Sequence, residues 1–279
     1  MNQKIEYRNY LEDVQGLFPM PRILAEIARL LKDDDTTIDD LAELLMTDPT
    51  LVAELTKLSN SSYFGFAEKS DSLSEAMQRI GMREIARLVG VCTAGEVYQA
   101  ELRHYRIPPD VFWESGIAAA LLMEALAEKT NKDSESAYLA GMMRESGMLV
   151  IDYALSREGV EVLWDAYVPV QKWERDCCGH DHMEVGAALL EVWGFSKAVC
   201  EAVAEQWEEG NQREGLSALL NFTNRVLART GCEFNTPIEP FSDFAEAAEA
   251  LGLSEEAVAI AIDRAKGTSA RLRGGVLEK

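Results

Sequence analysis

The sequence lacks the segments that carry a protein into or across a membrane. Among its 279 residues, no apolar run approaches the roughly 18 residues that a membrane-spanning helix needs. The N-terminal stretch, MNQKIEYRNY, has no basic residues followed by an apolar core, as a secretory signal would. Secretion and membrane insertion are therefore both disfavoured, and we predict a cytoplasmic protein with no membrane partner.

The cysteines do not form the pattern of a disulfide framework. They are odd in number and irregularly spaced: Cys92, Cys177, Cys178, Cys200 and Cys232. Disulfide-rich secreted domains carry even numbers of cysteines at framework-like spacings, so we predict reduced thiols in the cytoplasm. Most of these cysteines are expected to be small core residues.

Positive charge is scarce as well. The chain has 27 Lys and Arg residues against 48 Asp and Glu residues, which gives a net charge of -21. Because binding to a phosphate backbone relies on clustered cations, a general nucleic-acid partner is disfavoured. The basic residues between Arg264 and Arg273 are better explained as the solvated face of a C-terminal helix. No low-complexity tract is present, and an apolar content of 47% is that of an ordinary folded protein.

The sequence does contain helical periodicity along most of its length, without a convincing alternating strand. We therefore predict an all-α protein. The polar, turn-forming segment 101–109 ends in a Pro-Pro pair through which no helix can run. This segment predicts a boundary between an N-terminal helical subdomain, residues 1–107, and a second helical domain, residues 108–279. The second domain should open with a long helix, Asp110–Lys129, which is apolar on more than one side and is therefore expected to be buried.

Apolar spacing and capping residues predict the remaining helices. In the N-terminal part we expect helices after Pro21, through Leu41 to Leu45, after Asp48-Pro49, and on both sides of Gly81. In the second part we expect them over Ser134–Met143, Gly147–Leu155, Val160–Tyr167, Asp181–Trp193, Ser196–Glu208 and Leu216–Arg229, with two more after Ser242. Gly274 and Gly275 are expected to lie in an unstructured tail.

Two segments in different domains carry the most specific motifs. The first, LSNSSYFG at residues 58–65, places a polar turn and an aromatic pair after a helix, with Asn60, Ser61, Tyr63 and Gly65 as its characteristic residues. The second runs from FWESGIAAALLMEALAEK through AYLAGMMRESGML to GHDHMEVGAALLEVWGF. Each piece alone has an ordinary explanation, since an aromatic pair can cover a core and Asn and Ser are common in turns.

In order, spacing and residue character these segments resemble the HDOD family, the HD-related output domains of bacterial signalling proteins. The resemblance covers roughly residues 17–207. It implies an all-α, HDOD-like architecture in which an N-terminal helical bundle packs on an HD-type helical domain. It also implies partners among the signalling proteins of two-component, chemotaxis or cyclic-dinucleotide pathways.

The resemblance also locates a metal site that has lost its ligands. Metal-dependent HD phosphohydrolases use a histidine on the long helix, a His-Asp doublet on the next helix and a later aspartate to hold a divalent cation that activates water. By position, the first histidine falls at Ser115 and the doublet at Arg144 and Glu145, while His182 would line the same vestigial pocket. Serine is a poor replacement ligand, and a guanidinium has no lone pair to offer a metal. The resemblance therefore implies no catalytic residues and no cofactor.

Two interpretations of Arg144 stay open at this point. Its guanidinium could supply the positive charge that the metal once provided, pairing with Glu145 and joined by Ser115. Alternatively, Arg144 and Glu145 could have drifted to a solvated elbow once ligation was no longer required. The position of the Arg144 side chain decides between the two.

The run CCGHDH at residues 177–182 is a weak alternative metal site. Thiolates and imidazoles bind zinc, so Cys177, Cys178, His180 and His182 are candidate ligands. Adjacent cysteines seldom converge on one ion, however, and no second ligand pair lies elsewhere. The run is better explained as a helix start, with Asp181 as the cap and Glu184 in the first turn. The remaining histidine, His104, is expected at the surface near the domain boundary.

Together these features predict a non-catalytic, cytoplasmic signal-transduction module that acts through protein-protein interactions. A second copy of the same chain is one of the partners considered, which would make the protein a homo-oligomer. The alternative function is a divalent-metal-dependent phosphohydrolase that acts on nucleotides or cyclic dinucleotides. Such an enzyme would need non-standard ligands drawn from His180, His182, Glu145 and Asp152.

Overall fold

The computed structural model describes residues 5–17, 21–33, 35–60, 64, 72–97, 101–207, 215–230 and 244–276. Every regular element in these ranges is helical, apart from an isolated β-bridge between Leu102 and Ile107. The prediction of an all-α protein is therefore confirmed. None of the helices in the described ranges combines the length and the apolar character needed to cross a bilayer.

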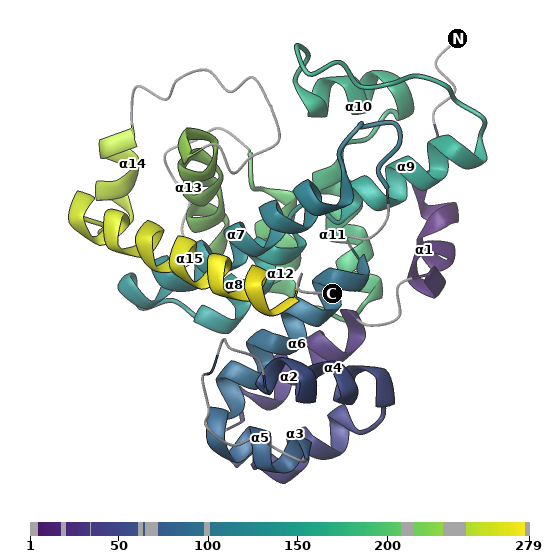
Figure 1. Ribbon diagram of the computed structural model, residues 1–279. Coiled ribbons are helices and arrows are strands. Elements are labelled where there is room, and N and C mark those ends of the chain that lie inside the picture. The colour runs from purple at the N-terminus through teal and green to yellow at the C-terminus, as the bar shows by residue number, and fades with distance from the viewer. Residues whose placement is uncertain are drawn as a thin grey trace.

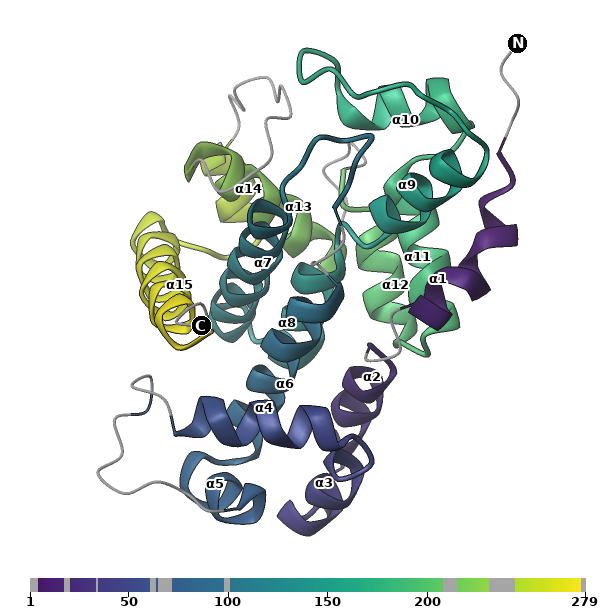
Figure 2. The same cartoon turned by 45° about the vertical axis from the view of Figure 1, so that its right-hand side comes forward.

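The N-terminal part of the chain forms a lobe of short helices. Its elements are η1 (Tyr7–Tyr10), α1 (Leu11–Leu17), α2 (Pro21–Leu30), α3 (Ile38–Leu45), α4 (Pro49–Ser59), α5 (Leu73–Ile80) and α6 (Met82–Val97). Helices α2 to α6 lie together at the bottom of Figures 1 and 2, while α1 lies apart from them and packs on α9 and α11. Thr37 caps α3 in a reciprocal capping box with Asp40, and Asp48 caps α4. Gly81, with φ of 91°, separates α5 from α6 as predicted.

The second part is built around one buried helix, α7. Its elements are α7 (Pro109–Lys129), α8 (Ser134–Met143), α9 (Gly147–Arg157), α10 (Val170–Cys178), α11 (His182–Val192), α12 (Lys197–Ala204), α13 (Gly215–Thr230), α14 (Phe244–Ala250) and α15 (Glu255–Val276). Helix α7 contacts α6, α8, α13 and α15 and has buried residues on all sides, as the sequence predicted. Figure 2 shows α15 lying beside α7, and α8 on another side of it.

Two predictions of local structure are wrong, and one helix was missed. Residues 160–167 form no helix, because Gly159, at φ of 66°, ends α9 and the backbone N–H of Trp164 donates instead to the carbonyl oxygen of His104 at 2.7 Å. Helix α10 follows this segment and was not predicted. Helix α15 runs through Gly274 and Gly275 to Val276, so these glycines do not lie in an unstructured tail.

The segment around the predicted boundary folds back onto the second part of the chain. His104 is only 7% exposed, so its predicted surface position is wrong. Its backbone N–H and its Nδ1 both contact Asp152 Oδ1 on α9, at 2.8 and 3.0 Å, and its Nε2 lies 2.9 Å from the carbonyl oxygen of Val160. The next residue, Tyr105, donates its hydroxyl to Glu174 at 2.7 Å. Two of the polar side chains in the predicted boundary segment, His104 and Tyr105, are therefore satisfied inside the protein.

Candidate functional site

The four residues predicted to line a vestigial HD pocket lie together in the interior. Ser115 comes from α7, Arg144 and Glu145 from the elbow between α8 and α9, and His182 from the first turn of α11, and all four are buried. Gly147 makes this meeting feasible, since a Cβ at that position would lie 2.0 Å from the carbonyl oxygen of His182. The Arg-Glu-Ser-Gly elbow can therefore lie directly against the start of α11.

Arg144 points into the protein. Its side chain has 0% exposure. One terminal nitrogen donates to Glu145 Oε1 at 2.6 Å and to Asn224 Oδ1 at 3.3 Å, and the other donates to Ser115 Oγ at 2.5 Å. Of the two interpretations of this residue, the solvated elbow is wrong, and the guanidinium supplies an internal positive charge.

His182 continues the network away from Arg144. Its Nε2 lies 3.1 Å from Glu145 Oε2, close enough for an ion pair although the two atoms are not aligned as a hydrogen bond. Its Nδ1 lies 2.8 Å from Glu174 Oε2, and its backbone N–H donates to the same oxygen at 3.0 Å. The chain of contacts therefore runs from Ser115 through Arg144, Glu145 and His182 to Glu174, and every member is buried.

The charges in this network balance. Burial alone would raise the pKa of Glu145, but the positive charges of Arg144 and His182 outweigh burial and lower it to about 2. Burial alone would lower the pKa of His182, but Glu174 and Glu145 outweigh burial and raise it well above 6.5. Glu145 is therefore ionised and His182 is an imidazolium at neutral pH. Two cations face two carboxylates, which is the condition under which buried charges are tolerated.

Amide side chains of Gln206, Asn221 and Asn224 stabilise the elbow between α8 and α9 through further hydrogen bonds. Gln206 donates to the backbone carbonyl oxygen of Arg144 at 2.8 Å, and Asn224 on α13 donates to Gln206 Oε1 at 3.0 Å. Asn221 donates to the backbone carbonyl oxygen of Gln206 at 2.9 Å. These bonds fix the position of Arg144 through residues distant in the chain, and sequence reasoning identified none of them.

Glu174 is the other member that sequence reasoning missed. It lies on α10 with 0% exposure and accepts hydrogen bonds from both His182 and Tyr105. The available signal was an ionisable residue beside Trp173 on the face of α10 that buries Val170 and Cys178. Because α10 itself was not predicted, that signal could not be used.

The residues at this position do not fit a divalent metal. A guanidinium offers no lone pair, and the two nitrogens of His182 face carboxylates on opposite sides of its ring, so Glu145 and Glu174 cannot converge with it on one ion. Within the described ranges, no group of three or more His, Cys, Asp and Glu side chains is placed to hold a metal ion.

The candidate zinc residues at 177–182 have separate partners. Cys178 Sγ donates to the carbonyl oxygen of Glu174 at 3.1 Å, and burial raises the pKa of this thiol to about 11. His180 contacts Glu184 at 2.9 Å and lies edge-on to Tyr7, away from the partners of His182. Asp181 caps α11 by accepting the N–H groups of Met183 and Glu184, as predicted.

The turn motif of the N-terminal part is described only in part. Asn60 follows the end of α4 as its C-cap residue, and Phe64 packs against the core. Ser61, Tyr63 and Gly65 lie outside the described residues, as does Cys232.

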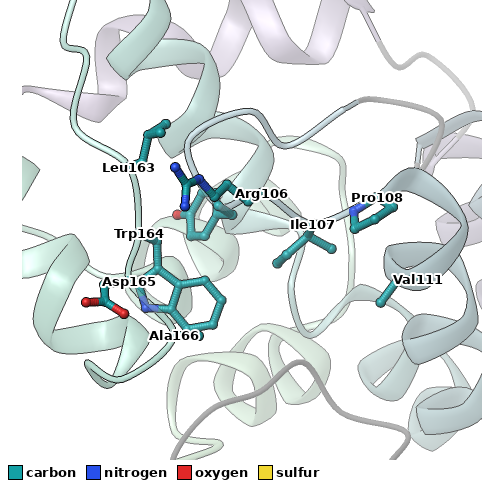
Figure 3. A pocket seen from close by; sticks show the side chains of 9 residues that line it. Arg106, Ile107, Pro108, Val111, Leu163, Trp164, Asp165 and Ala166 are labelled. Carbon is teal, nitrogen blue, oxygen red and sulfur yellow. The ribbon is translucent and has the colours of Figure 1, made fainter.

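Among the cavities that border the second part of the chain, two have volumes of several hundred Å³. One, of about 590 Å³, lies where residues 105–108 and the start of α7 meet residues 163–166 (Figure 3). Leu163 and Val111 line this cavity and are exposed. Trp164 and Asp165, which follow Leu163 on the same non-helical segment, line it too. The other cavity, of about 470 Å³, lies between α7, α13 and α15 and includes Ser115 in its lining.

Comparison with known proteins identifies the class to which this all-α chain belongs. The HDOD domain model matches residues 17–209, and the chain belongs to the HDOD family. The resemblance predicted from the motifs is thereby confirmed. An uncharacterised protein of Treponema pallidum (strain Nichols) is 25% identical over 189 residues, which are 66% of this chain and 36% of that protein. The chain thus spans only about a third of the length of this relative.

Solved structures show the same fold. An HDOD domain protein of Geobacter sulfurreducens matches with a TM-score of 0.71 and 19% identity, covering 97% of this chain and 96% of that one. A candidate signal transduction protein of Marinobacter aquaeolei VT8 matches with a TM-score of 0.69 and 19% identity, and the match covers 100% of this chain and 62% of that one. A candidate phosphohydrolase of Shewanella amazonensis SB2B matches with a TM-score of 0.66 and 18% identity, and the match covers 99% of this chain and 98% of that one. At these identities the likeness concerns the fold alone.

Proposed function

We propose that this chain is a non-catalytic signal-transduction module of the cytoplasm, which acts by binding protein partners and in which HD phosphohydrolase chemistry has been lost. The observation that carries the proposal is the buried Arg144 guanidinium, bonded to Ser115 and Glu145 where the family resemblance locates metal ligands. Arginine stays protonated at any pH at which proteins are folded. A permanent cation therefore stands where an enzyme of this kind needs lone pairs.

The balance of charge supports the same proposal. A divalent ion at this position would meet both Arg144 and the imidazolium of His182. It would also have to compete for the carboxylates of Glu145 and Glu174, which are already ion-paired. Displacing these partners would leave buried cations without counter-charges, at a cost of several kcal/mol, about 3–5 for each broken pair.

Exposed apolar side chains support a role in protein contact. Val162, Leu163 and Tyr167 are exposed to 48%, 44% and 92% on the non-helical segment beside the cavity of Figure 3, and Val111 is exposed on its opposite wall. Apolar side chains gathered in this way mark interaction surfaces. Because the chain carries a net charge of -21, a partner with a basic face is favoured. From the family resemblance we propose partners in two-component, chemotaxis or cyclic-dinucleotide pathways, with a second copy of the chain as one arrangement.

The loss of catalysis is tested by metal analysis and by phosphodiesterase assays. Purified protein with added Mn²⁺ is assayed on a cyclic dinucleotide and on bis-p-nitrophenyl phosphate. We expect the parent protein to contain no stoichiometric metal. Its turnover should not exceed that of the variant Glu145→Gln, in which the carboxylate charge is removed. Mn²⁺-dependent turnover that Glu145→Gln or His182→Ala abolishes would establish the alternative, a phosphohydrolase with non-standard ligands.

A restored variant tests whether the position is right. Ser115→His, Arg144→His and Glu145→Asp together place the family's expected ligand types at the three sites. Because imidazoles and a carboxylate then replace the guanidinium, this variant should bind Mn²⁺ more tightly than the parent protein. Circular dichroism confirms that the variant is folded before its metal content is compared. Equal metal content in folded variant and parent would count against the assigned positions.

The contact surface is tested with a matched pair of variants. Leu163→Asp places a charge on the apolar segment, and Met46→Asp places one at the residue that follows the end of α3, where Met46 is 59% exposed. Pull-downs with response regulators and cyclic-dinucleotide enzymes from one host should lose a partner with Leu163→Asp and keep it with Met46→Asp. Loss with both variants, or with neither, would place the contact elsewhere.

A further inference from the structure

The cavity between α7, α13 and α15 is an apolar space joined to the buried ion-pair network. It has a volume of about 470 Å³, within the roughly 300–1,000 Å³ of small-molecule sites. Most of its lining is aliphatic, contributed by all three helices: Ala118, Leu122, Val226, Leu227, Ile262 and Ala265. Ser115 also lines it, and this residue accepts a hydrogen bond from Arg144 on its buried side.

Ser115 borders this cavity and has an unused donor. The side chain is 2% exposed, and its oxygen accepts from Arg144 at 2.5 Å. In the part of the chain that the structure describes, its own hydroxyl proton has no acceptor. A buried donor without an acceptor destabilises the protein, so an acceptor atom placed in the cavity would remove that penalty. The bond from the guanidinium also polarises the hydroxyl, which makes it a stronger donor.

The charged groups of the lining restrict the ligand further. Lys266 on α15 is the one cation among the described residues that line the cavity, and it makes no ion pair within those residues. Glu114 on α7 also lines the cavity and already has an interaction of its own. A single negative charge on a ligand therefore finds Lys266 as its counter-charge, whereas a ligand cation would find no carboxylate that is not already engaged.

We propose that this cavity binds a small amphipathic monocarboxylic acid, whose carboxylate accepts the Ser115 hydroxyl and whose apolar body lies against the aliphatic walls. Lys266 balances its charge. Helix α15 forms the outer wall and is held to α7 by the ion pair between Arg264 and Glu128. A ligand in the cavity would therefore contact both α7 and α15. Binding itself does not depend on whether the chain hydrolyses phosphates.

The test titrates the full chain with decanoate and with decanol, and follows binding by isothermal titration calorimetry. Decanoate should bind with one site per chain and more tightly than decanol. Ser115→Ala should weaken decanoate on the order of tenfold or more, because a hydrogen bond to a charged group contributes about 1.5–3 kcal/mol. Equal affinities for decanoate and decanol, or an unchanged affinity in Ser115→Ala, would overturn the assignment of the carboxylate to Ser115.

A pair of isoleucines on α15 provides a matched control that leaves the network untouched. Ile262→Trp fills the cavity, and Ile260→Trp places the same ring on a half-exposed position of the same helix outside it. Binding should be lost in Ile262→Trp and retained in Ile260→Trp, with both variants folded by circular dichroism. Binding retained in Ile262→Trp, or absent from the parent protein, would overturn the proposal.

Discussion

Replacing Arg144 by Met should destabilise the protein far more than removing a surface arginine. The guanidinium has no exposed surface and holds Glu145 at 2.6 Å and Ser115 at 2.5 Å. Methionine keeps the apolar stem but leaves the buried Glu145 carboxylate with only His182 as a described charged partner. Breaking a buried ion pair by removing one partner costs about 3–5 kcal/mol, a large part of the roughly 5–15 kcal/mol of a typical domain. We expect a loss of about 3 kcal/mol or more in the free energy of unfolding.

The same substitution should change how stability depends on pH. Burial opposes ionisation of Glu145, but Arg144 and His182 outweigh it, and the folded-state pKa is about 2 against an ordinary 4.5. A carboxyl whose pKa is lowered on folding contributes stability above its unfolded pKa, and this contribution is lost as the pH falls from 4.5 towards 2. The difference corresponds to on the order of 3 kcal/mol. In Arg144→Met the acid-induced loss should be smaller, because the pKa of Glu145 rises.

Urea unfolding between about pH 7 and about pH 3 measures both effects. Arg79→Met is the control, since Arg79 pairs with Glu75 at the surface and is 30% exposed. Its loss should stay below about 1 kcal/mol, with an unchanged pH profile. If Arg144→Met also lost less than about 1 kcal/mol and kept the parent profile, the buried ion pair would be refuted.

Other parts of the structure make separate predictions. Burial lowers the pKa of His182, but Glu174 and Glu145 raise it well above 6.5, so its contribution is complete below pH 6.5 and is lost as the pH rises through the folded pKa. His182→Gln should therefore flatten the alkaline side of the urea-unfolding profile, and an unchanged profile would contradict a charged imidazole. Gly147→Ala should cost about 3 kcal/mol or more, because its Cβ would lie 2.0 Å from the His182 carbonyl oxygen. Gly16→Ala is the control, because a Cβ at Gly16 would have no atom within 4 Å and should not destabilise the protein. Equal losses of stability for the two variants in thermal melts would contradict the close approach of Gly147 to α11. Burial raises the pKa of Cys178 to about 11, so mass spectrometry should find slower iodoacetamide labelling in the folded chain than in urea, and equal rates would count against it.

Local signals predicted most of the helices correctly. Thr37, Asp48 and Asp181 cap α3, α4 and α11 because each needs only its own neighbours along the chain to bond the first N–H groups. Periodicity likewise predicted α8 and α13 closely. It failed at residues 160–167, where the apolar residues face a cavity and solvent, and where Trp164 bonds to His104 far back in the chain.

The sequence by itself determined the helical class and the HDOD resemblance, because these depend on local spacing and on motif order. The resemblance in turn implied the set Ser115, Arg144, Glu145 and His182. Only the tertiary structure decided that Arg144 points inward and that Glu174 completes the network. The physical reason is that the charge state of a buried group depends on partners brought near by folding. Arg144 and its partner Asn224 are 80 residues apart in the chain, and no local pattern records such a contact.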